Sequence, residues 1–298
     1  MLVFKNHTLN EQFQRYGYVV VNLLDDAELR ELTAIHVRHP APSDIQSDVE
    51  ASLLTADLGY RRSVHNEIKA VLDERIDELL LDYRIFHASF INKRPRTAAS
   101  AMHLHQDAPF VDERDCTNFL IWCPLVEVGP DNGWLCMAAG TQRFNKGFRR
   151  SGMPYPELKT VIQERFLTCL GVRPGQVVFF HPRALHSSPA NRTDELRVVV
   201  AGSIVPRACT RFHLCHPAPE LGEHMLEVFE VDEELFHHHI LGRRPVGARS
   251  HSVLAAPPEP LDIDLLTETC AALVRGPTDS AIVHGFRAHE VGQRHPSN

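Results

Sequence analysis

The sequence has no apolar run close to the ~20 residues that a membrane-spanning helix needs. Residues 1–10 contain no apolar segment typical of a secretory signal. Lysine and arginine form no cluster, and 31 basic against 38 acidic residues leave a formal charge of −7. We therefore expect a cytoplasmic protein that binds neither a membrane nor a nucleic acid.

Paired cysteine motifs are absent as well. The seven cysteines are odd in number and include no CxxC. Together with the lack of a secretory signal, this pattern predicts reduced and mostly buried thiols. The chain also has no internal repeats, which favours a single domain over an array.

The composition itself is that of an ordinary globular protein with a sizeable core: 43% of the residues are hydrophobic and 23% are charged. We interpret residues 1–298 as one domain. Within it we expect a helical N-terminal support at 1–82, a β core at 83–215 and a helical or irregular C-terminal extension at 216–298. Glycines and prolines punctuate residues 139–171, which we expect to form an insertion or lid.

Capping and turn residues mark the N-terminal elements. Capping boxes at Thr8-x-x-Glu11 and Asp25-x-x-Glu28 predict two helix starts, and Gly17 predicts the end of the first helix. Further expectations by range are a strand at 18–21, an irregular segment at 40–62 and an amphipathic helix at 64–82.

From Tyr83 the hydrophobic pattern changes to a period of two, which is typical of strands. Strand-like segments lie at 83–92, 103–108, 117–128, 134–138, 176–180, 185–188, 196–205 and 209–214. A short helix is expected at 157–165 and another at 223–240, followed by weak periodicity from 243 onward. The pattern predicts a mainly β fold with flanking helices, a double-stranded β-helix (jelly roll, cupin-like) barrel.

Two short stretches carry the chemistry. His105 and Asp107 are two residues apart, so in a strand they point to the same face. Together with His186 they supply two imidazoles and one carboxylate, the ligand set of non-haem Fe(II) oxygenases. Arg197 lies on the strand after His186 and suits a carboxylate such as that of 2-oxoglutarate, because guanidinium binds carboxylates bidentately.

These residues resemble the signature of the phytanoyl-CoA dioxygenase-like Fe(II)/2-oxoglutarate-dependent oxygenases. The eleven-residue step from His186 to Arg197, with Asn132-Gly133 and Pro174-Gly175 before it, matches the family pattern. The resemblance covers roughly residues 17–206. It implies an enzyme that uses Fe(II), 2-oxoglutarate and O2 to hydroxylate or otherwise oxidise a small-molecule metabolite of a biosynthetic pathway.

The resemblance also implies roles for further residues. Ser188 and Thr193 match hydroxyl positions that help to hold 2-oxoglutarate, and Trp122 and Asn92 match cosubstrate-pocket positions. His103 competes with His105, but the family pattern uses the histidine two residues before the carboxylate. His181 competes with His186, but Arg192, eleven residues after it, is expected to lie exposed in a hairpin and is a poor rival to Arg197.

Two alternative functions are weighed against this reading. A jelly-roll protein that binds a metal or ligand without turnover has no need of an arginine at position 197. A 2-oxoglutarate-dependent halogenase needs a small residue in place of the carboxylate ligand, and Asp107 disfavours it.

Overall fold

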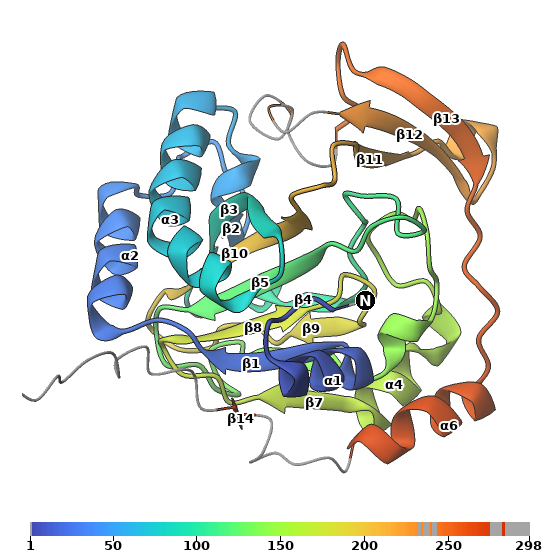
Figure 1. The fold of residues 1–298 in the computed structure, drawn as a ribbon, viewed down its shortest axis with the longest axis horizontal. Helices are drawn as coiled ribbons and strands as arrows, with labels where there is room; N and C mark the ends of the chain where they lie inside the picture. The colour runs from blue at the N-terminus through green and yellow to red at the C-terminus, as the bar shows by residue number, and fades with distance from the viewer. Residues whose placement is uncertain (1, 232–233, 235–238, 240–242, 275–281, 284–298) are drawn as a thin grey trace, which may run out of the picture.

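The computed structural model describes residues 2–231, 234, 239, 243–274 and 282–283. Two β-sheets face each other, helices cover the outer face of the larger one, and a third sheet stands to one side (Figure 1). The helices are α1 (His7–Tyr16), α2 (Asp26–Arg38), α3 (Leu58–Leu79), α4 (Lys159–Arg165) and α6 (Ile263–Val274).

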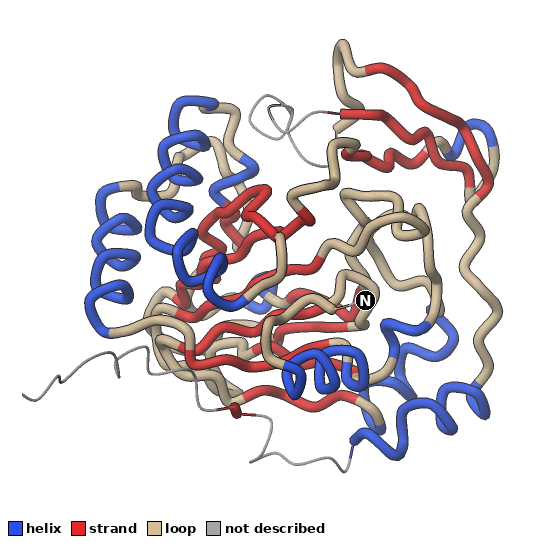
Figure 2. Tube along the Cα trace, in the orientation of Figure 1, coloured by secondary structure: helices blue, strands red, loops and turns tan. Residues whose placement is uncertain are grey.

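The strands make up the greater part of the interior (Figure 2). They are β1 (Tyr18–Asn22), β2 (Val49–Ala51), β3 (Tyr83–Lys93), β4 (Met102–His105), β5 (Phe119–Pro124), β6 (Leu135–Ala138), β7 (Leu167–Leu170), β8 (Gln176–Phe180), β9 (His186–Ser188), β10 (Arg197–Pro206), β11 (Phe212–Pro217), β12 (Met225–Val231), β13 (Arg249–Ala255) and β14 (Ile282–Val283).

The larger sheet has the order β14-β1-β8-β5-β10-β3-β2 and is antiparallel except where β14 joins β1. Its residues alternate between two cores because side chains in a strand alternate between faces. Val198 and Val200 of β10 face the core with α1, α2 and α3, whereas Val199 faces the smaller sheet.

The smaller sheet has the order β4-β9-β6-β7 and packs Leu135 and Met137 against the larger one. This arrangement is the expected jelly roll. The described strands form separately hydrogen-bonded sheets, however, so they close no continuous barrel.

The N-terminal expectations are confirmed in part. The capping box at Asp25 and Glu28 is present, and Gly17 ends α1 with a φ of 81°, which favours glycine. The expected box at Thr8 is wrong, because Asn6 caps α1 by accepting a hydrogen bond from the Leu9 amide.

Residues 40–62, expected to be irregular, contain ordered elements. They include β2, a 3₁₀ helix η1 (Ser52–Leu54) and the first turns of α3. Asp57 caps α3 by accepting from the Tyr60 amide at 3.0 Å, so the helix starts well before the expected residue 64.

The segment 139–171 is more than an insertion. It contains the 3₁₀ helix η4 (Pro156–Leu158), α4 close to its expected position, and β7, which pairs with β6 in the smaller sheet. Its action as a lid stays a prediction.

The cysteine expectation is wrong at one pair. Cys136 and Cys169 lie directly opposite each other on β6 and β7 and form a disulfide. The sequence contains no hint of this pairing, since the two residues are 33 positions apart and only the strand register brings them together.

The C-terminal expectations also need correction. Residues 225–231 form a strand rather than part of a helix, because buried Leu226 and Val228 alternate with Glu227. β12 pairs with both β11 and β13 to make the third sheet, which we call the cap sheet. The rest of the expected helix at 223–240 lies largely outside the described residues.

After the cap sheet, α6 returns to the body of the molecule (Figure 1). Leu266 and Cys270 of α6 are fully buried against a core that includes Phe144 and Ile162. No helix in the described ranges is both long and apolar enough to cross a membrane.

Candidate metal centre

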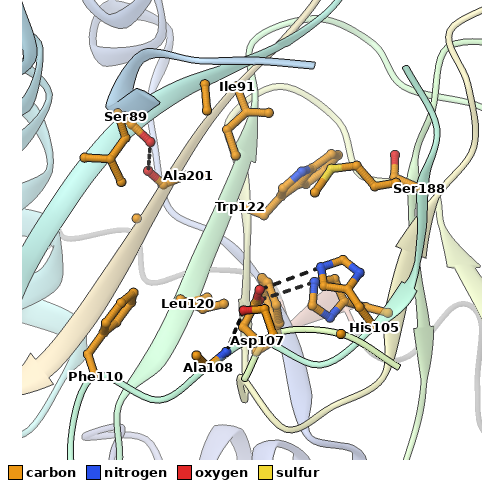
Figure 3. Close-up of a pocket in the computed structure, with 18 of the residues that line it drawn as sticks. Ser89, Ile91, His105, Asp107, Ala108, Phe110, Leu120, Trp122, Ser188 and Ala201 are labelled. Atoms are coloured by element: carbon orange, nitrogen blue, oxygen red, sulfur yellow. Dashed lines mark hydrogen bonds and ion pairs between the residues drawn. The ribbon is translucent and has the colours of Figure 1, made fainter. Parts of the chain in front are cut away.

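The smaller sheet brings the three expected ligands together. His105 ends β4 and His186 begins β9, and strand pairing places them directly opposite each other. Asp107 follows two residues after β4, and its amide donates to the Pro182 carbonyl at 2.9 Å. One ligand atom from each residue lies within 4.8 Å of the others, so the three side chains converge on one point. Figure 3 shows Asp107 and His105 at this point.

Local hydrogen bonds orient both imidazoles. Nδ1 of His105 donates to the His103 carbonyl at 2.6 Å, and Nδ1 of His186 donates to the Ala184 carbonyl at 2.9 Å. With Nδ1 protonated, each Nε2 keeps its lone pair. The Nε2 atoms of His105 and His186 lie 3.7 and 3.4 Å from the Asp107 carboxylate oxygens.

These spacings fit metal ligands better than an ion pair. Burial, and then the neighbouring His105, lowers the pKa of His186 to about 4, so its imidazole is neutral at pH 7. Ligand atoms about 2.1 Å from a metal and at right angles to each other stand about 3 Å apart. The nitrogen and oxygen donors present therefore suit a divalent transition metal.

The competing histidines lie elsewhere. His103 is exposed, because an irregularity between Met102 and His105 breaks the strand alternation that would put it beside His105. Only its backbone carbonyl supports the site. The side chain of His181 is held by Arg183, with Nε2 3.2 Å from the guanidinium, and is not part of the cluster.

Arg197 is a buried cation to which the described residues offer no counter-charge. Its side chain is 1% exposed, and Nε and Nη1 have no hydrogen-bond partner among the described residues. Burial lowers the pKa of Arg197 to about 9, which still leaves it protonated at pH 7. Its guanidinium lies 5.9 Å from the Trp122 ring centroid, a cation–π distance. Two unsatisfied donors on a buried cation fit a carboxylate ligand.

A second cation, Lys93, was not among the residues expected from the sequence. It is the cross-strand partner of Arg197 and has no exposed surface. Its ammonium donates to the carbonyls of Ser188 and Pro189 at 2.8 and 2.5 Å. Burial, and then the charge of Arg197, lowers the pKa of Lys93 to about 7. The pairing of β3 with β10, which places Lys93 opposite Arg197, is the feature that identifies this residue.

Two of the expected cosubstrate residues point away from the cavity. Asn92 pairs with Val198 on the opposite face of the sheet and lies 3.2 Å from Nε2 of His36. The Thr193 hydroxyl donates to Asn191 at 2.7 Å, within the turn before β10. Neither side chain lines the cavity in this structure, and their part in cosubstrate binding stays a prediction.

The other two, Trp122 and Ser188, line a cavity of about 630 Å³ that reaches His105, Asp107, His186 and Arg197. The Ser188 hydroxyl donates to the Gly133 carbonyl at 2.8 Å, which holds it at the wall. The cavity lies between the two facing sheets and is lined mostly by apolar side chains (Figure 3). One cavity thus contains both the metal ligands and the buried guanidinium.

Fold and site together define a jelly-roll protein with a two-histidine, one-carboxylate metal centre. The sequence model of the family Phytanoyl-CoA dioxygenase (PhyH) matches residues 13–199, more than half of the chain. The chain belongs to this family. No curated protein matches the sequence.

Solved structures share the fold at low sequence identity. The epimerase SnoN, solved with Fe3+, alpha ketoglutarate and nogalamycin RO, is 20% identical over 87% of this chain and 96% of its own, with a TM-score of 0.51. HygX from Streptomyces hygroscopicus, solved with nickel, 2-oxoglutarate and hygromycin B, is 14% identical over 68% of this chain and 88% of its own, with a TM-score of 0.50.

Proposed function

We propose that the protein is an Fe(II)/2-oxoglutarate-dependent dioxygenase that oxidises a small-molecule metabolite. One observation supports this above all: the metal ligands and the unpaired, buried Arg197 line the same cavity. The structural relatives SnoN and HygX, each solved with a metal and this oxo acid, agree with the proposal.

The ligands would hold iron through Nε2 of His105, Nε2 of His186 and the Asp107 carboxylate. Their Nδ1 bonds to backbone carbonyls keep both rings aimed at the same point before metal arrives. Three protein ligands leave coordination positions open for the cosubstrate and O2. When bound, the iron supplies the O2 chemistry that side chains lack.

Arg197 would bind the distal carboxylate of 2-oxoglutarate, because it offers two unused donors in a low-dielectric site. Trp122 packs beside the guanidinium and limits its movement. Lys93 holds the backbone of Ser188, at the end of the strand that begins with His186, and of Pro189, the residue after that strand. The cosubstrate and metal positions are thus tied together through β9.

Hydroxylation of a C–H bond is the reaction we propose, with release of succinate and CO2. Desaturation, ring formation and epoxidation would use the same residues, so the mass of the product decides among them. Halogenation conflicts with Asp107, whose carboxylate takes the place that a halide would need. A binding protein without turnover leaves the unpaired charge of Arg197 unexplained.

The test is anaerobic titration of the protein with Fe(II) and then 2-oxoglutarate, followed by the metal-to-ligand charge-transfer absorbance. We expect one iron per chain and a saturable band, lost in His105→Ala, Asp107→Ala and His186→Ala. His103→Ala is the matched control, since its backbone carbonyl remains and its exposed side chain contacts no ligand. Loss of the band in His103→Ala but not in His105→Ala would contradict the assignment.

A further inference from the structure

The cavity continues past the metal ligands into a space with apolar walls. Leu53 of η1, Phe110, Leu120 of β5, and Leu214 and Pro217 of β11 line this part, and Figure 3 shows Phe110 and Leu120 beside Asp107. Ser89 and Ala201, which are cross-strand neighbours, leave the space open because their side chains are small. A ligand here would bury apolar surface, at a gain of about 25 cal/mol per Å².

Apart from the metal ligand Asp107, the charged side chains on the cavity wall are positive. Among the described residues that line it, Asp107 is the single carboxylate, and Arg150 is the single cation besides Arg197. An ammonium group on a substrate would therefore find no free carboxylate. An anionic group would find the Arg150 guanidinium, for which the described residues provide no ion-pair partner.

The backbone on both sides of Arg150 is anchored. On one side, buried Arg149 forms a double hydrogen bond with Glu113, at 2.7 and 3.1 Å. On the other side, Gly152 exchanges two backbone hydrogen bonds with Gln106, at 2.9 and 3.0 Å. These bonds hold the backbone at Arg150 in a set position relative to Asp107, the residue after Gln106, while the Arg150 side chain itself is exposed.

The Ser151 hydroxyl adds a third anchor, accepting from the Ala108 amide at 2.9 Å. The segment that carries Arg150 is therefore hydrogen-bonded directly to both neighbours of Asp107. A cation on this segment can orient a substrate with respect to the metal, because three hydrogen bonds join the segment to the two neighbours of Asp107.

We propose, resting on the function proposed above, that the substrate is a bulky apolar molecule with one anionic group. Its apolar body lies between Leu53, Phe110 and Leu214, and its anion pairs with Arg150. Arg150 is then a specificity-determining residue, which selects acids over amines and over neutral analogues of the same shape.

Two dyes with the same ring skeleton test this chemistry. 8-Anilino-1-naphthalenesulfonate carries one anionic group on an apolar body, and N-phenyl-1-naphthylamine is the same body without the sulfonate. Each is titrated by fluorescence into the anaerobic protein saturated with Fe(II) and 2-oxoglutarate, so that the sulfonate cannot take the Arg197 position. We expect the wild type to bind the sulfonate more tightly than the neutral dye.

Arg150→Gln should weaken binding of the sulfonate dye roughly tenfold, which is the effect expected for loss of a hydrogen bond to a charged group. The same variant should leave the dissociation constant of the neutral dye within about twofold of the wild-type value. Arg173→Gln is the matched control: this arginine is also exposed but lies outside the cavity. Equal loss of both dyes in Arg150→Gln, or no change in either, overturns the proposal.

Ala201→Phe and Ser89→Leu each fill the space at the cavity wall. Ser89→Leu replaces Ala201→Phe in the test if Ala201→Phe does not fold. We expect either variant to weaken both dyes. Binding that neither variant weakens places the dyes outside the cavity and overturns the proposal. The charge-transfer band in the same samples reports the iron and 2-oxoglutarate site separately, so failure of the substrate class and failure of the proposed function give different results.

Discussion

At the residue scale, the cost of burying Arg197 is its most informative property. A guanidinium at 1% exposure with two idle donors is unfavourable unless an anion binds to it. Removal of one partner of a buried charge pair costs ~3–5 kcal/mol. Arg197→Ala should therefore raise the 2-oxoglutarate dissociation constant by roughly two to three orders of magnitude.

Anaerobic titration followed by the charge-transfer band measures this change. Arg197→Lys should recover part of the affinity, because it restores charge without the bidentate geometry. Iron affinity should stay near that of the wild type, since Arg197 is not a ligand. Arg192→Ala, an exposed neighbour in the preceding turn, is the control. Affinity for 2-oxoglutarate within a few-fold of wild type in Arg197→Ala would show that another residue binds the cosubstrate.

Lys93 makes cosubstrate binding sensitive to pH. Burial, and then Arg197, lowers its pKa to about 7 in the free protein, and a bound anion next to Arg197 stabilises the charged ammonium and raises that pKa again. Binding therefore takes up a proton at pH values above about 7, and 2-oxoglutarate affinity should fall as the pH rises from there.

Calorimetry at pH 8 in two buffers of different ionisation enthalpy measures the proton uptake. Lys93→Met should abolish the part due to this residue, whereas Lys69→Met, on the solvent side of α3, should not. Equal proton uptake in the wild type and Lys93→Met would mean that a different group titrates.

Sequence spacing was enough to predict that His105, Asp107 and His186 cluster and that Arg197 points inward, because a two-residue step and a short turn leave their side chains few alternatives. The spacing could not predict that Asn92 lies on the helix-covered face of the sheet or that Lys93 is fully buried. Whether a residue of β3 faces the cavity or the helices depends on its register with β10, and a shift of one residue exchanges the faces. Lys93 pairs with Arg197 and Asn92 pairs with Val198, so these adjacent residues lie on opposite faces of the sheet.

At the element scale, the disulfide joins the two strands farthest from β4 in the smaller sheet. It closes a loop of 33 residues, so in the chain-entropy account reduction should lower the free energy of unfolding by up to about 3–4 kcal/mol. Urea unfolding with and without a reducing agent measures this difference, and the Cys136→Ala/Cys169→Ala double variant should no longer respond. Cys116→Ser, at a free cysteine, should respond as the wild type does.

Counting the free thiols tests directly whether the disulfide between Cys136 and Cys169 is present. Alkylation of the protein unfolded without reductant should label five of the seven cysteines. Labelling of all seven would show that β6 and β7 are held by hydrogen bonds and packing alone.

Strands with a clear period of two and turn residues at both ends were predictable from the sequence: the expected strand at 176–180 coincides with β8. β12 was not predictable in this way, because its two glutamates and mixed apolar residues fit a helix as well as a strand. Its pairing with β11 and β13 decides for the strand. α6 follows a proline-rich stretch, and its apolar face is explained only by the distant core that it covers.

At the scale of the whole molecule, α6 tests the expectation of a single domain. Leu266 is fully buried against the core with Phe144 and Ile162, whereas its neighbour Leu265 is 42% exposed. Leu266→Ala should lower the free energy of unfolding by about 2–5 kcal/mol and Leu265→Ala by far less. Differential scanning calorimetry should show one shifted transition; a wild-type melting temperature in Leu266→Ala would separate α6 from the core.

The cap sheet has a consequence for how the cavity could be redesigned. The residues matched by the family end at 199, before β11, so the strands with the metal ligands belong to the shared part of the chain. Leu214, Cys215 and Pro217, on the cap-sheet side of that boundary, nevertheless line the cavity. Substitutions at these three positions would therefore change the wall of the cavity and leave the three ligands and Arg197 in place. If the proposed function holds, a library that randomises only these positions would vary the choice of substrate around an unchanged metal site.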